Sequence, residues 1–428
     1  MRAMKDSGIE WIGQIPQEWD TNRIKYVYEI ISGNGFKEHL QGNSTGDYPF
    51  YKVSDINGVG RNIYHAANYV SKDVVSEYRF SVVPAGALIM SKIGEALKKN
   101  HRKITSVDCV VDNNLQALVP IATIDARYFF YQFLCIDMAW FDNGGTIPSV
   151  NNQKLLDFRI ASPSISVQKR IADYLDSKCN EIDALIAAKE KTNALLKERR
   201  QSIIYEAVTK GLNPDAPMKD SGIEWIGQIP EHWTVKKIKY LGTFRNGLTY
   251  SPDNVTNEES GTLVLRSSNI QNGNVVFDDN VYVDMDIPEI LQVTAGDILI
   301  CSRNGSRELI GKNAIIPENV KASFGAFMMI FRCGDPKYLY YILNSNVFSY
   351  YLGTFLTSTV NQLTAANFGN MKVVYCDSAE EREEIVAHLD QKCEELDAAI
   401  STNEATIQKL KEYRQSIIYE AVTGKIEI

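Results

Sequence analysis

Thirteen consecutive residues occur twice in this chain, and half the length of the chain separates the two copies. Residues 4–16 (MKDSGIEWIGQIP) are repeated at 218–230, an offset of 214 positions in a chain of 428. The same offset relates residues 200–209 to residues 414–423. A repeat of half the chain predicts two copies of one structural unit. Residues 20–160 and 234–375 have diverged between nearly constant ends. We therefore expect one scaffold that presents two different recognition surfaces.

The composition is that of a protein with ordinary hydrophobic cores. With 44% hydrophobic residues, the chain can bury the cores of about two to four domains. No apolar run reaches the roughly 18 residues that cross a bilayer, and the first residues contain no signal-peptide stretch. The seven cysteines are scattered without C-x-x-C spacing, which favours reduced thiols and argues against a zinc site. We expect a cytoplasmic protein that contacts no membrane.

The charge is divided unevenly between the two copies. Residues 1–214 contain 26 Lys+Arg and 24 Asp+Glu, a charge of +2. Residues 215–428 contain 19 and 29, a charge of −10, and the two values sum to the net −8 of the chain. Proteins that bind nucleic acids usually carry a basic footprint. Any such footprint must here be local, or shared with partner subunits.

Each copy ends in a segment with the apolar periodicity of a long helix. Sustained heptads form coiled coils, in which polar seam residues set the register. A helix of about 42 residues would span roughly 60 Å, and alone it would expose its apolar seam. We expect the two helices to form an antiparallel pair with pseudo-two-fold symmetry; the alternative is that each packs into its own globular domain. Ser378 and Glu381 predict a capping box at the second helix. The seam positions are Leu175, Cys179, Ile182, Ile186, Lys189, Asn193, Leu196, Arg200, Ile203 and Ala207, then Leu389, Cys393, Leu396, Ile400, Asn403, Ile407, Leu410, Arg414, Ile417 and Ala421.

The diverged segments predict an α+β fold that both copies share. Short β-like runs at 87–90 and 298–300 follow turn signals, and residues 128–134 and 338–343 read as apolar helices at similar places. The predicted architecture is two globular domains and a pair of long antiparallel helices. The expected boundaries are 1–162 for the first recognition domain, 163–213 for the first helix, 214–376 for the second domain and 377–428 for the second helix.

A set of short motifs recurs in the same order in both copies. Residues 8–16 with Trp19 match residues 222–230 with Trp233, and residues 296–305 (GDILICSRNG) have a counterpart in 87–94 (ALIMSKIG). Further motifs are 49–56 (PFYKVSDI), 265–270 (LRSSNI) and 145–151 (GTIPSVN). In this order the motifs resemble the specificity (S) subunits of type I restriction-modification systems. The resemblance covers essentially the whole chain, although Val167 and Asp377 depart from the family pattern where the helices begin.

The resemblance implies a DNA-binding subunit with no catalytic activity of its own. Each recognition domain would read one half of a bipartite, asymmetric target in double-stranded DNA, with half-sites about one helical turn, roughly 34 Å, apart. The helices would set this gap and bind two methyltransferase (M) subunits. The M subunits would methylate adenine with S-adenosylmethionine, and restriction (R) subunits would use ATP and Mg to translocate and cut DNA. No cofactor would bind to this chain.

The residues themselves agree that chemistry must come from partners. The sequence contains no G-x-x-x-x-G-K-[ST] loop and no G-x-G-x-x-G fingerprint. The five histidines are isolated, with no H-E-x-x-H and no repeated Ser/His/Asp pattern. We therefore expect no catalytic residue and no metal site in the chain.

A protein that reads duplex DNA needs Lys, Arg and hydroxyl groups for phosphates, and Arg, Lys, Asn, Gln or Asp for base edges. In the first insert the candidates form two groups, of which the basic run 98–103 is the sharpest, although a solvated loop is the usual role of such a run. Lys52 and Arg266 occupy equivalent positions, which favours a shared contact. The first-insert candidates are Lys52, Ser54, Asp55, Ser91, Lys92, Lys98, Lys99, His101, Arg102 and Lys103. The second-insert candidates are Arg266, Ser267, Asn269, Ser302, Arg303, Asn304, Arg307, Lys312, Asn361 and Gln362.

Two other functions stay open. One is a fused enzyme with its own nuclease or methyltransferase domain, against which the missing motifs count. The other is a protein–protein scaffold whose inserts bind proteins, which the net charge of −8 keeps open. Salt-dependent binding to DNA in the presence of an M subunit separates a DNA reader from a scaffold.

Overall fold

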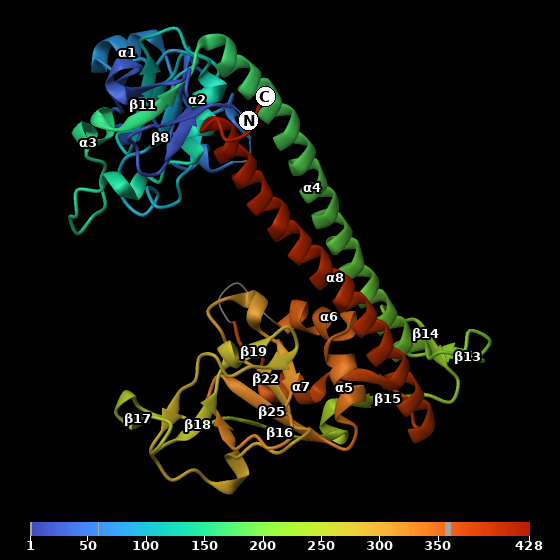
Figure 1. Cartoon of the computed structure of the whole chain (residues 1–428). Helices are drawn as coiled ribbons and strands as arrows, with labels where there is room; N and C mark the ends of the chain where they lie inside the picture. The colour runs from blue at the N-terminus through green and yellow to red at the C-terminus, as the bar shows by residue number, and fades with distance from the viewer. Residues whose placement is uncertain (1, 59, 356–360) are drawn as a thin grey trace. The chain divides into compact units, whose positions relative to one another are not determined.

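The computed structural model describes residues 2–58, 60–355 and 361–428 (Figure 1). The chain divides into two compact units, which we call unit 1 and unit 2. Unit 1 consists of Met1–Lys189 and Ala405–Ile428, and unit 2 consists of Glu190–Glu404. Each unit contains one globular part and about half of each long helix, α4 (Ile165–Lys210) and α8 (Ala379–Val422). The predicted α+β class, with two sheet-containing parts and two long helices, is confirmed. The four-part division at 163, 214 and 377 stays a prediction.

In unit 1 a hairpin opens the chain and two sheets form the insert. Strand β3 (Asp20–Arg23) pairs with β12 (Arg159–Ser162), so the start and the end of the insert lie side by side. The other strands are β1 (Met4–Asp6), β2 (Gln14–Pro16), β4 (Tyr28–Ser32), β5 (Tyr48–Tyr51), β6 (Asn62–Ile63), β7 (Asn68–Val70), β8 (Leu88–Ser91), β9 (Arg102–Thr105), β10 (Val110–Val111) and β11 (Leu115–Pro120), and the helices are α1 (Lys72–Tyr78), α2 (Ala126–Leu134) and α3 (Asn152–Asp157). The larger sheet has the order β4-β11-β8-β9-β6, and the smaller has β10-β5-β7.

Unit 2 repeats this arrangement with strands and connections of different lengths. Strand β15 (Thr234–Lys237) pairs with β26 (Lys372–Tyr375). The other strands are β13 (Met218–Asp220), β14 (Gln228–Pro230), β16 (Gly242–Asn246), β17 (Val255–Thr256), β18 (Thr262–Leu265), β19 (Ile270–Gln271), β20 (Asn274–Val275), β21 (Tyr282–Val283), β22 (Ile298–Cys301), β23 (Asn313–Ile315), β24 (Ala322–Phe324) and β25 (Met328–Cys333), and the helices are α5 (Pro336–Leu343), α6 (Asn346–Phe355) and α7 (Ala365–Asn370). The sheets have the orders β16-β25-β22-β23 and β17-β21-β18-β24.

The strand pairings show that the two diverged inserts share one fold. The order β4-β11-β8-β9 in unit 1 corresponds to β16-β25-β22-β23 in unit 2, and the parallel pair β10·β5 corresponds to β24·β18. The register also matches, because Leu115 faces Ser91 where Met328 faces Cys301. The two predicted strands are β8 and β22, and the two predicted apolar helices are α2 and α5.

The long helices run antiparallel in each unit. In unit 1, Ile182 and Ile186 of α4 pack with Ile407 of α8, while Asp183 pairs with Arg414. Residue numbers thus rise along one helix as they fall along the other. In unit 2, Arg200 pairs with Asp397, and Asn403 Nδ2 donates to Asn193 Oδ1 at 2.9 Å. The predicted apolar seam is confirmed, since its Cys, Ile and Ala residues are buried or partly buried.

One tryptophan of the constant frame packs in each globular part, Trp19 in unit 1 and Trp233 in unit 2. Trp19 and Trp233 are 1% and 0% exposed, so each belongs to the core of its globular part. Trp19 lies beside Gly424 at the end of α8, and Trp233 lies beside Gly211 at the end of α4.

In the described part of the chain, no helix is both long and apolar enough to cross a bilayer.

Candidate functional site

A cavity of about 580 Å³ lies in unit 2 where several strands end. We call it the strand-end pocket. Its wall comes from the segments that follow β16, β18 and β22, from the segment that connects β24 to β25, and from the carboxylate-bearing Asp279. The side chains that give it chemical character are Tyr250, Arg266, Ser267, Arg303, Asn304 and Phe327. Two guanidinium groups, an amide and two aromatic rings therefore share one hollow.

Arg266 enters the pocket because the chain turns tightly after β18. Its backbone N–H donates to Asn269 Oδ1 at 2.9 Å, which closes the 3-10 turn η7 (Ser267–Asn269). Its Nη2 donates to Asp279 Oδ2 at 2.8 Å, so the guanidinium is held on one side only. An arginine fixed in this way presents its remaining N–H donors in a defined direction.

Arg303 and Asn304 follow β22 and form the opposite wall. The Arg303 N–H donates to the carbonyl of Phe327 at 3.0 Å, and its guanidinium lies 5.1 Å from the centre of the Phe327 ring. Asn304 Nδ2 donates to Ser267 Oγ at 3.1 Å, and Lys312 Nζ donates to Ser267 O at 3.2 Å. Phe327 is nevertheless 57% exposed, so the pocket offers solvent an aromatic face and a cation together.

Next to the pocket, Gly247 permits a close approach of two backbone segments. A Cβ atom on Gly247 would collide with the carbonyl oxygens of Phe324 and Gly325. Gly33 meets the backbone of Asp112 in the same way in unit 1. Only a residue without Cβ fits where two backbones lie this close.

Unit 1 has a corresponding surface at the ends of its own strands. Lys52 follows β5 as Arg266 follows β18, and its N–H donates to Asp55 Oδ2 at 2.7 Å in the same capping arrangement. The predicted equivalence of Lys52 and Arg266 is thus confirmed as a position in the fold. Lys52 Nζ lies 5.0 Å from the Phe36 ring and donates to Gln41 Oε1 at 2.8 Å. The two units therefore place a cation at the same point, surrounded by different side chains.

The structure brings together most of the second-insert candidates. Asn361 Nδ2 donates to Gly305 O at 3.3 Å, Gln362 pairs with Arg303 through the backbone, and Arg307 is exposed at the start of the 3-10 turn η9 (Arg307–Leu309). Two of the second-insert candidates are buried, so their side chains are not accessible to DNA. Asn269 is 0% exposed and serves the turn, and Ser302 is 2% exposed with its hydroxyl donated to Phe327 O at 3.0 Å.

The expectation that residues 98–103 form one exposed basic run is wrong for its last members. Arg102 and Lys103 are 4% and 3% exposed, because they lie in β9 between two neighbouring strands. Their cationic ends bind backbone carbonyls, that of Ile136 for Arg102 and those of Gly58 and Gly60 for Lys103. Burial lowers the pKa of Arg102 to about 10 and lowers the pKa of Lys103. Both residues therefore stabilise the insert, and they are not part of the candidate surface.

The remaining first-insert candidates are divided between surface and interior. Ser91 is 3% exposed at the end of β8, so it is also removed from the candidate surface. Lys98 and Lys99 are exposed, Lys98 Nζ being 2.9 Å from Glu95 Oε1, and His101 is half-buried. The side chains that stay accessible at the strand ends are those of Lys52, Ser54, Asp55 and Lys92.

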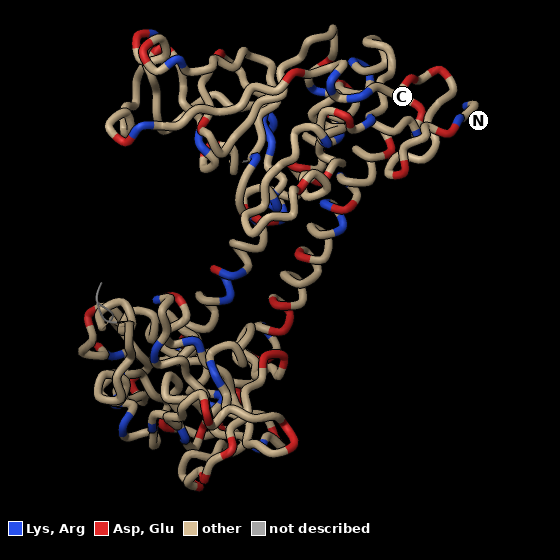
Figure 2. The backbone as a smooth tube through the Cα atoms, turned by 90° about the vertical axis from the view of Figure 1, so that its left-hand side faces the viewer, with Lys and Arg blue, Asp and Glu red and all other residues tan. Residues whose placement is uncertain are grey.

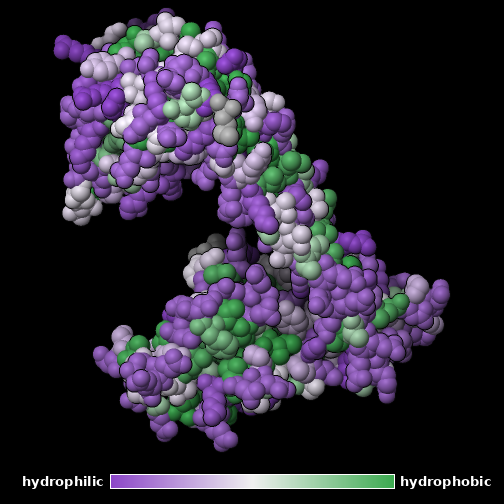
Figure 3. Space-filling model, viewed as in Figure 1, coloured by the Kyte–Doolittle hydropathy of each residue, from purple (hydrophilic) through white to green (hydrophobic). Residues whose placement is uncertain are grey.

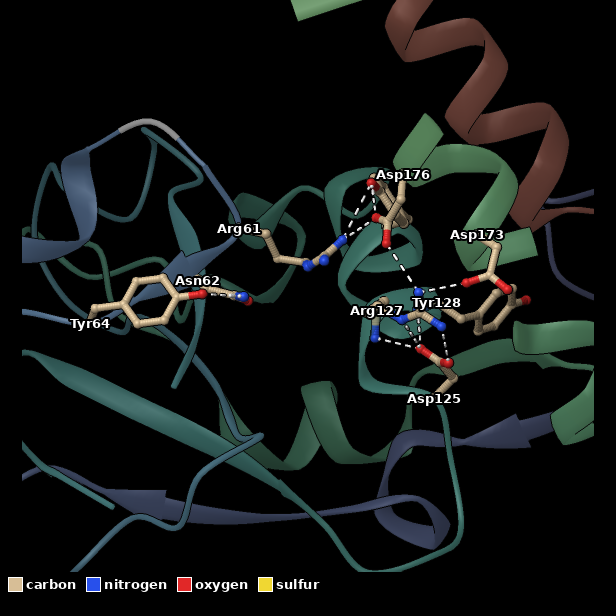
Figure 4. A network of polar contacts seen from close by, with 9 residues as sticks. Arg61, Asn62, Tyr64, Asp125, Arg127, Tyr128, Asp173 and Asp176 are labelled. Atoms are coloured by element: carbon tan, nitrogen blue, oxygen red, sulfur yellow. Dashed lines mark hydrogen bonds and ion pairs between the residues drawn. The ribbon is translucent and has the colours of Figure 1, made fainter. Parts of the chain in front are cut away.

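A polar network that the sequence did not indicate ties the first insert to α4 (Figure 4). Asp176 of α4 accepts hydrogen bonds from Arg61, from Tyr131 at 2.6 Å and from Arg127 at 3.1 Å. Burial alone would raise the pKa of Asp176, but these hydrogen bonds outweigh it and leave its pKa lowered. Arg61 follows the 52–55 turn in the chain, so the network couples the segment next to the candidate surface to the long helix.

The charges of each unit are mixed in sign. Both signs of charge occur on both long helices and within both globular parts, and Asp and Glu predominate in the first half of α8 (Figure 2). On unit 2, the face seen in Figure 3 carries apolar patches within a hydrophilic surface. Among the described residues no cluster of His, Cys, Asp and Glu has the arrangement of a metal site. The strand-end surfaces thus supply cations, amides and aromatic rings for recognition.

The chain is thus a duplicated α+β protein with unlike polar surfaces at equivalent strand ends of its two globular parts. Residues 16–196 match the family model described as the type I restriction modification DNA specificity domain. The chain is 28% identical over 211 residues to the type I restriction enzyme StySPI specificity subunit of Salmonella potsdam, a match that covers 47% of this chain and 44% of that subunit. It is 22% identical over 430 residues to the MjaVIII specificity subunit of Methanocaldococcus jannaschii, covering 97% of this chain and 94% of that one.

A solved structure shares the fold of this chain. A chain from a study of complex assembly and conformational transition of the type I R-M system superposes with a TM-score of 0.68 at 15% identity, covering 96% of this chain and 99% of that one. The relatives StySPI and EcoKI, the latter from Escherichia coli K12, are each matched over only 44% of their own length. The chain therefore resembles the specificity subunits of type I restriction-modification systems, by a family model over residues 16–196 and by a relative that matches 97% of its length.

Proposed function

We propose that this chain is the DNA-reading subunit of a type I restriction-modification complex. Each insert reads one half of a bipartite, asymmetric target in double-stranded DNA, and the long helices dock two methyltransferase subunits and set the gap between the half-sites. Methyl transfer to adenine, ATP hydrolysis and cleavage belong to the methyltransferase and restriction subunits, which bind S-adenosylmethionine, ATP and Mg. The chain itself has no catalytic role, and it works in the cytoplasm, where its DNA lies.

One observation carries the proposal that each insert reads its own half-site. Lys52 and Arg266 occupy the same place in one fold, each capped by the side chain three residues later. The residues around them differ, with Phe36 and Gln41 beside Lys52 and with Asp279, Arg303 and Phe327 around Arg266. A shared cation contacts the phosphates or one base in both halves, while unlike neighbours select unlike bases. The two half-sites are therefore expected to differ in sequence.

An exchange of inserts tests this proposal directly. Residues 20–160 are replaced by the corresponding insert of another specificity subunit, and the methylated adenines are mapped in the genome of the host. We expect only one half of the target sequence to change. A change in both halves refutes independent reading by the two inserts. An unchanged target refutes DNA reading by the first insert.

Salt dependence separates DNA reading from a scaffold role. The assembled complex is expected to lose DNA affinity steeply as salt rises, because each neutralised phosphate releases counterions. Specific and non-specific duplexes are compared at several salt concentrations. A complex that binds neither duplex above background at low salt supports the scaffold that the net charge of −8 leaves open.

A further inference from the structure

A lysine–tyrosine pair with an exposed aromatic ring stands at the same place in both units. In unit 1 it belongs to the 3-10 turn η1 (Ile24–Tyr26), and in unit 2 to η5 (Ile238–Tyr240). The tyrosines are 63% and 72% exposed. Lys25 Nζ lies 5.6 Å from the centre of the Tyr26 ring, and Lys239 Nζ lies 5.3 Å from that of Tyr240. Both units thus present the same aromatic ring with the same cation beside it.

The fold explains the lysine of unit 1 in part, because Lys25 Nζ donates to Asp157 Oδ1 at 2.7 Å, but it does not explain why the two tyrosines are identical. The residues just before them, 20–23 and 234–237, differ at every position, and so do the two residues that follow each turn. Ile24 and Ile238 are 0% and 1% exposed, so core packing explains why this residue is kept. The outward-facing tyrosines, each with a lysine beside its ring, need another explanation. Exposed residues that stay the same while their neighbours change indicate that both units meet the same binding partner.

The position of the pair argues against the DNA-reading surface as the common partner site. Tyr240 precedes β16, whereas the strand-end pocket begins after the last residue of that strand, at Leu248 to Tyr250. A strand of five residues extends about 16 Å. In unit 1, Tyr26 precedes β4 in the same way. The pair therefore lies at the end of the strand opposite to the surface that we assign to DNA.

We propose that the pairs Lys25–Tyr26 and Lys239–Tyr240 are two equivalent docking points for one kind of protein partner, the methyltransferase subunit, bound once by each unit. This inference rests on the proposed function. A tyrosine offers a large rigid ring and a hydroxyl, and tyrosine is enriched among the residues that dominate protein interfaces. The matching surface of the partner has an apolar slot for the ring and a carboxylate for the lysine. Two copies of one epitope fix a stoichiometry of two partners per chain.

Binding of the methyltransferase subunit from the same type I system to the full-length chain tests the inference. Native mass spectrometry gives the stoichiometry, and titration gives the two dissociation constants. Tyr26→Ala is expected to weaken one binding step by about tenfold or more, and Tyr240→Ala the other. The double variant then binds neither partner at concentrations that saturate the wild-type chain. Lys25→Glu with Lys239→Glu provides a second pair of variants that acts through charge.

The control is Tyr64→Ala, which removes a tyrosine of similar exposure, 61%, from the diverged insert. This variant is expected to bind two partners, and thermal melting checks that every variant is folded. Two partners bound at wild-type affinity by the folded double variant overturn the docking inference and leave the proposed function intact. A wild-type chain that binds no methyltransferase subunit overturns the proposed function as well. If the double variant assembles normally but binds all DNA sequences more weakly, the pair contacts phosphates and the inference is wrong.

Discussion

Arg414 of α8 lies 3.1 Å from Asp183 of α4, and the repeat maps this ion pair onto Arg200 and Asp397, which are also 3.1 Å apart. Each distance joins the arginine Nε to a carboxylate oxygen. The two pairs lie in different units, and each joins the two long helices of its own unit. The same antiparallel register is therefore specified twice, once in each unit.

Reversal of one charge is expected to weaken the helix pair in unit 1. Arg414→Asp places two carboxylates side by side, and partly exposed pairs of this kind contribute up to about 1 kcal/mol. The free energy of unfolding is expected to fall by about that amount and to recover in the double variant Arg414→Asp with Asp183→Arg. Urea unfolding of the three proteins measures this. The equivalent change, Arg200→Asp, serves as the matched comparison. A double variant that is no more stable than the single one contradicts a direct pairing.

The end of each long helix meets the hairpin of a copy in the same way. Gly424 lies beside Pro16 and Trp19 in unit 1, as Gly211 lies beside Pro230 and Trp233 in unit 2. In unit 2 the chain connects Gly211 to Met218 directly, seven positions later. A bond from residue 428 to residue 1 would place Gly424 eight positions before Met4. The two copies can therefore be joined through residues 428 and 1, and the chain can be opened instead between Gly211 and Met218.

We expect a circular permutant that joins residue 428 to residue 1 and begins at Pro214 to fold and to dock its partners. Chain ends placed in exposed connections are usually tolerated. Residues 212–215 are exposed in the structure. The melting temperature and the DNA target of the permutant are compared with those of the original chain. A permutant opened inside β22 is the control and is expected not to fold. Failure of the first permutant to fold argues against the equivalence of the two helix–hairpin contacts.

Gly247 is expected to tolerate no side chain. Gly247→Ala forces its Cβ against two backbone carbonyls, and overpacking of this kind costs about 1–3 kcal/mol. The same substitution at Gly305, where no atom lies within 4 Å, is the control and is expected to leave the melting temperature within a few degrees of that of the unsubstituted chain. Differential scanning calorimetry of both variants checks the difference. Equal melting temperatures would falsify the close approach at Gly247.

The sequence predicted what is repeated or periodic, and it missed what depends on distant pairing. The seam of apolar residues at heptad spacing predicts α4 and α8, since both signals are local. Arg102 and Lys103 read as part of a charged loop, yet β9 begins at Arg102 and neighbouring strands bury it. Residues 98–103 are six charged or polar residues in succession, and this pattern does not predict that the last two are buried. Whether a cation faces solvent is decided by strands far away in the chain.

The helix cap and the strand-end pocket illustrate the same limit. Ser378 caps α8 as predicted, because it accepts a hydrogen bond from the Glu381 N–H at 3.2 Å. The second hydrogen bond of a capping box would go to the carboxylate of Glu381. This carboxylate instead accepts hydrogen bonds from Trp233 at 3.2 Å and from His232, which belong to the repeated frame. In the pocket, Arg266 and Arg303 were predicted as candidates. Phe327, whose ring centre lies 5.1 Å from the Arg303 guanidinium, was not, since a single aromatic residue in a loop gives no local signal.

Asp176 is expected to make the stability of unit 1 depend on pH. Its folded-state pKa lies below the ordinary value of about 3.9. A lowered pKa means that the stabilisation is fully present above the unfolded pKa and is lost as the pH falls through the folded one. Asp176→Asn should therefore lower the free energy of unfolding by about 1–3 kcal/mol at pH 7, because Arg61 and Arg127 lose a buried charged acceptor. The difference should shrink below about pH 4.

Asp173→Asn is the control for this change. Its side chain is 68% exposed against 23% for Asp176, and both pair with Arg127. Exposed pairs contribute little, so we expect less than about 1 kcal/mol at either pH. Urea unfolding at pH 7 and pH 3 gives the four comparisons. A loss at Asp176→Asn that is equally large at pH 3 shows that lost packing is its cause, and the carboxylate then has no special role.

The strand-end pocket predicts which substitutions change DNA reading by unit 2. Arg303→Ala and Arg266→Ala each remove a guanidinium that the pocket holds next to solvent. If these groups contact base edges, each substitution lowers the affinity of the assembled complex by about 1–3 kcal/mol. The loss should be confined to duplexes that carry the second half-site. Lys52→Ala should act in the same way on the first half-site. Arg303→Lys is also expected to fail, since an ammonium cannot reproduce the planar fork of donors.

Lys321→Ala is the matched control for the pocket, because Lys321 is exposed and precedes β24, at the end of the strand away from Phe327. It should leave the affinity for the specific duplex unchanged. Fluorescence titration with duplexes altered in one half-site at a time separates two kinds of contact. A base contact relaxes the preference at one position, whereas a phosphate contact weakens binding to all sequences and reduces the salt slope by about one. Equal losses for Arg266→Ala and Lys52→Ala on every duplex therefore assign this shared cation to phosphate, and selection of bases then falls to the unlike residues around it.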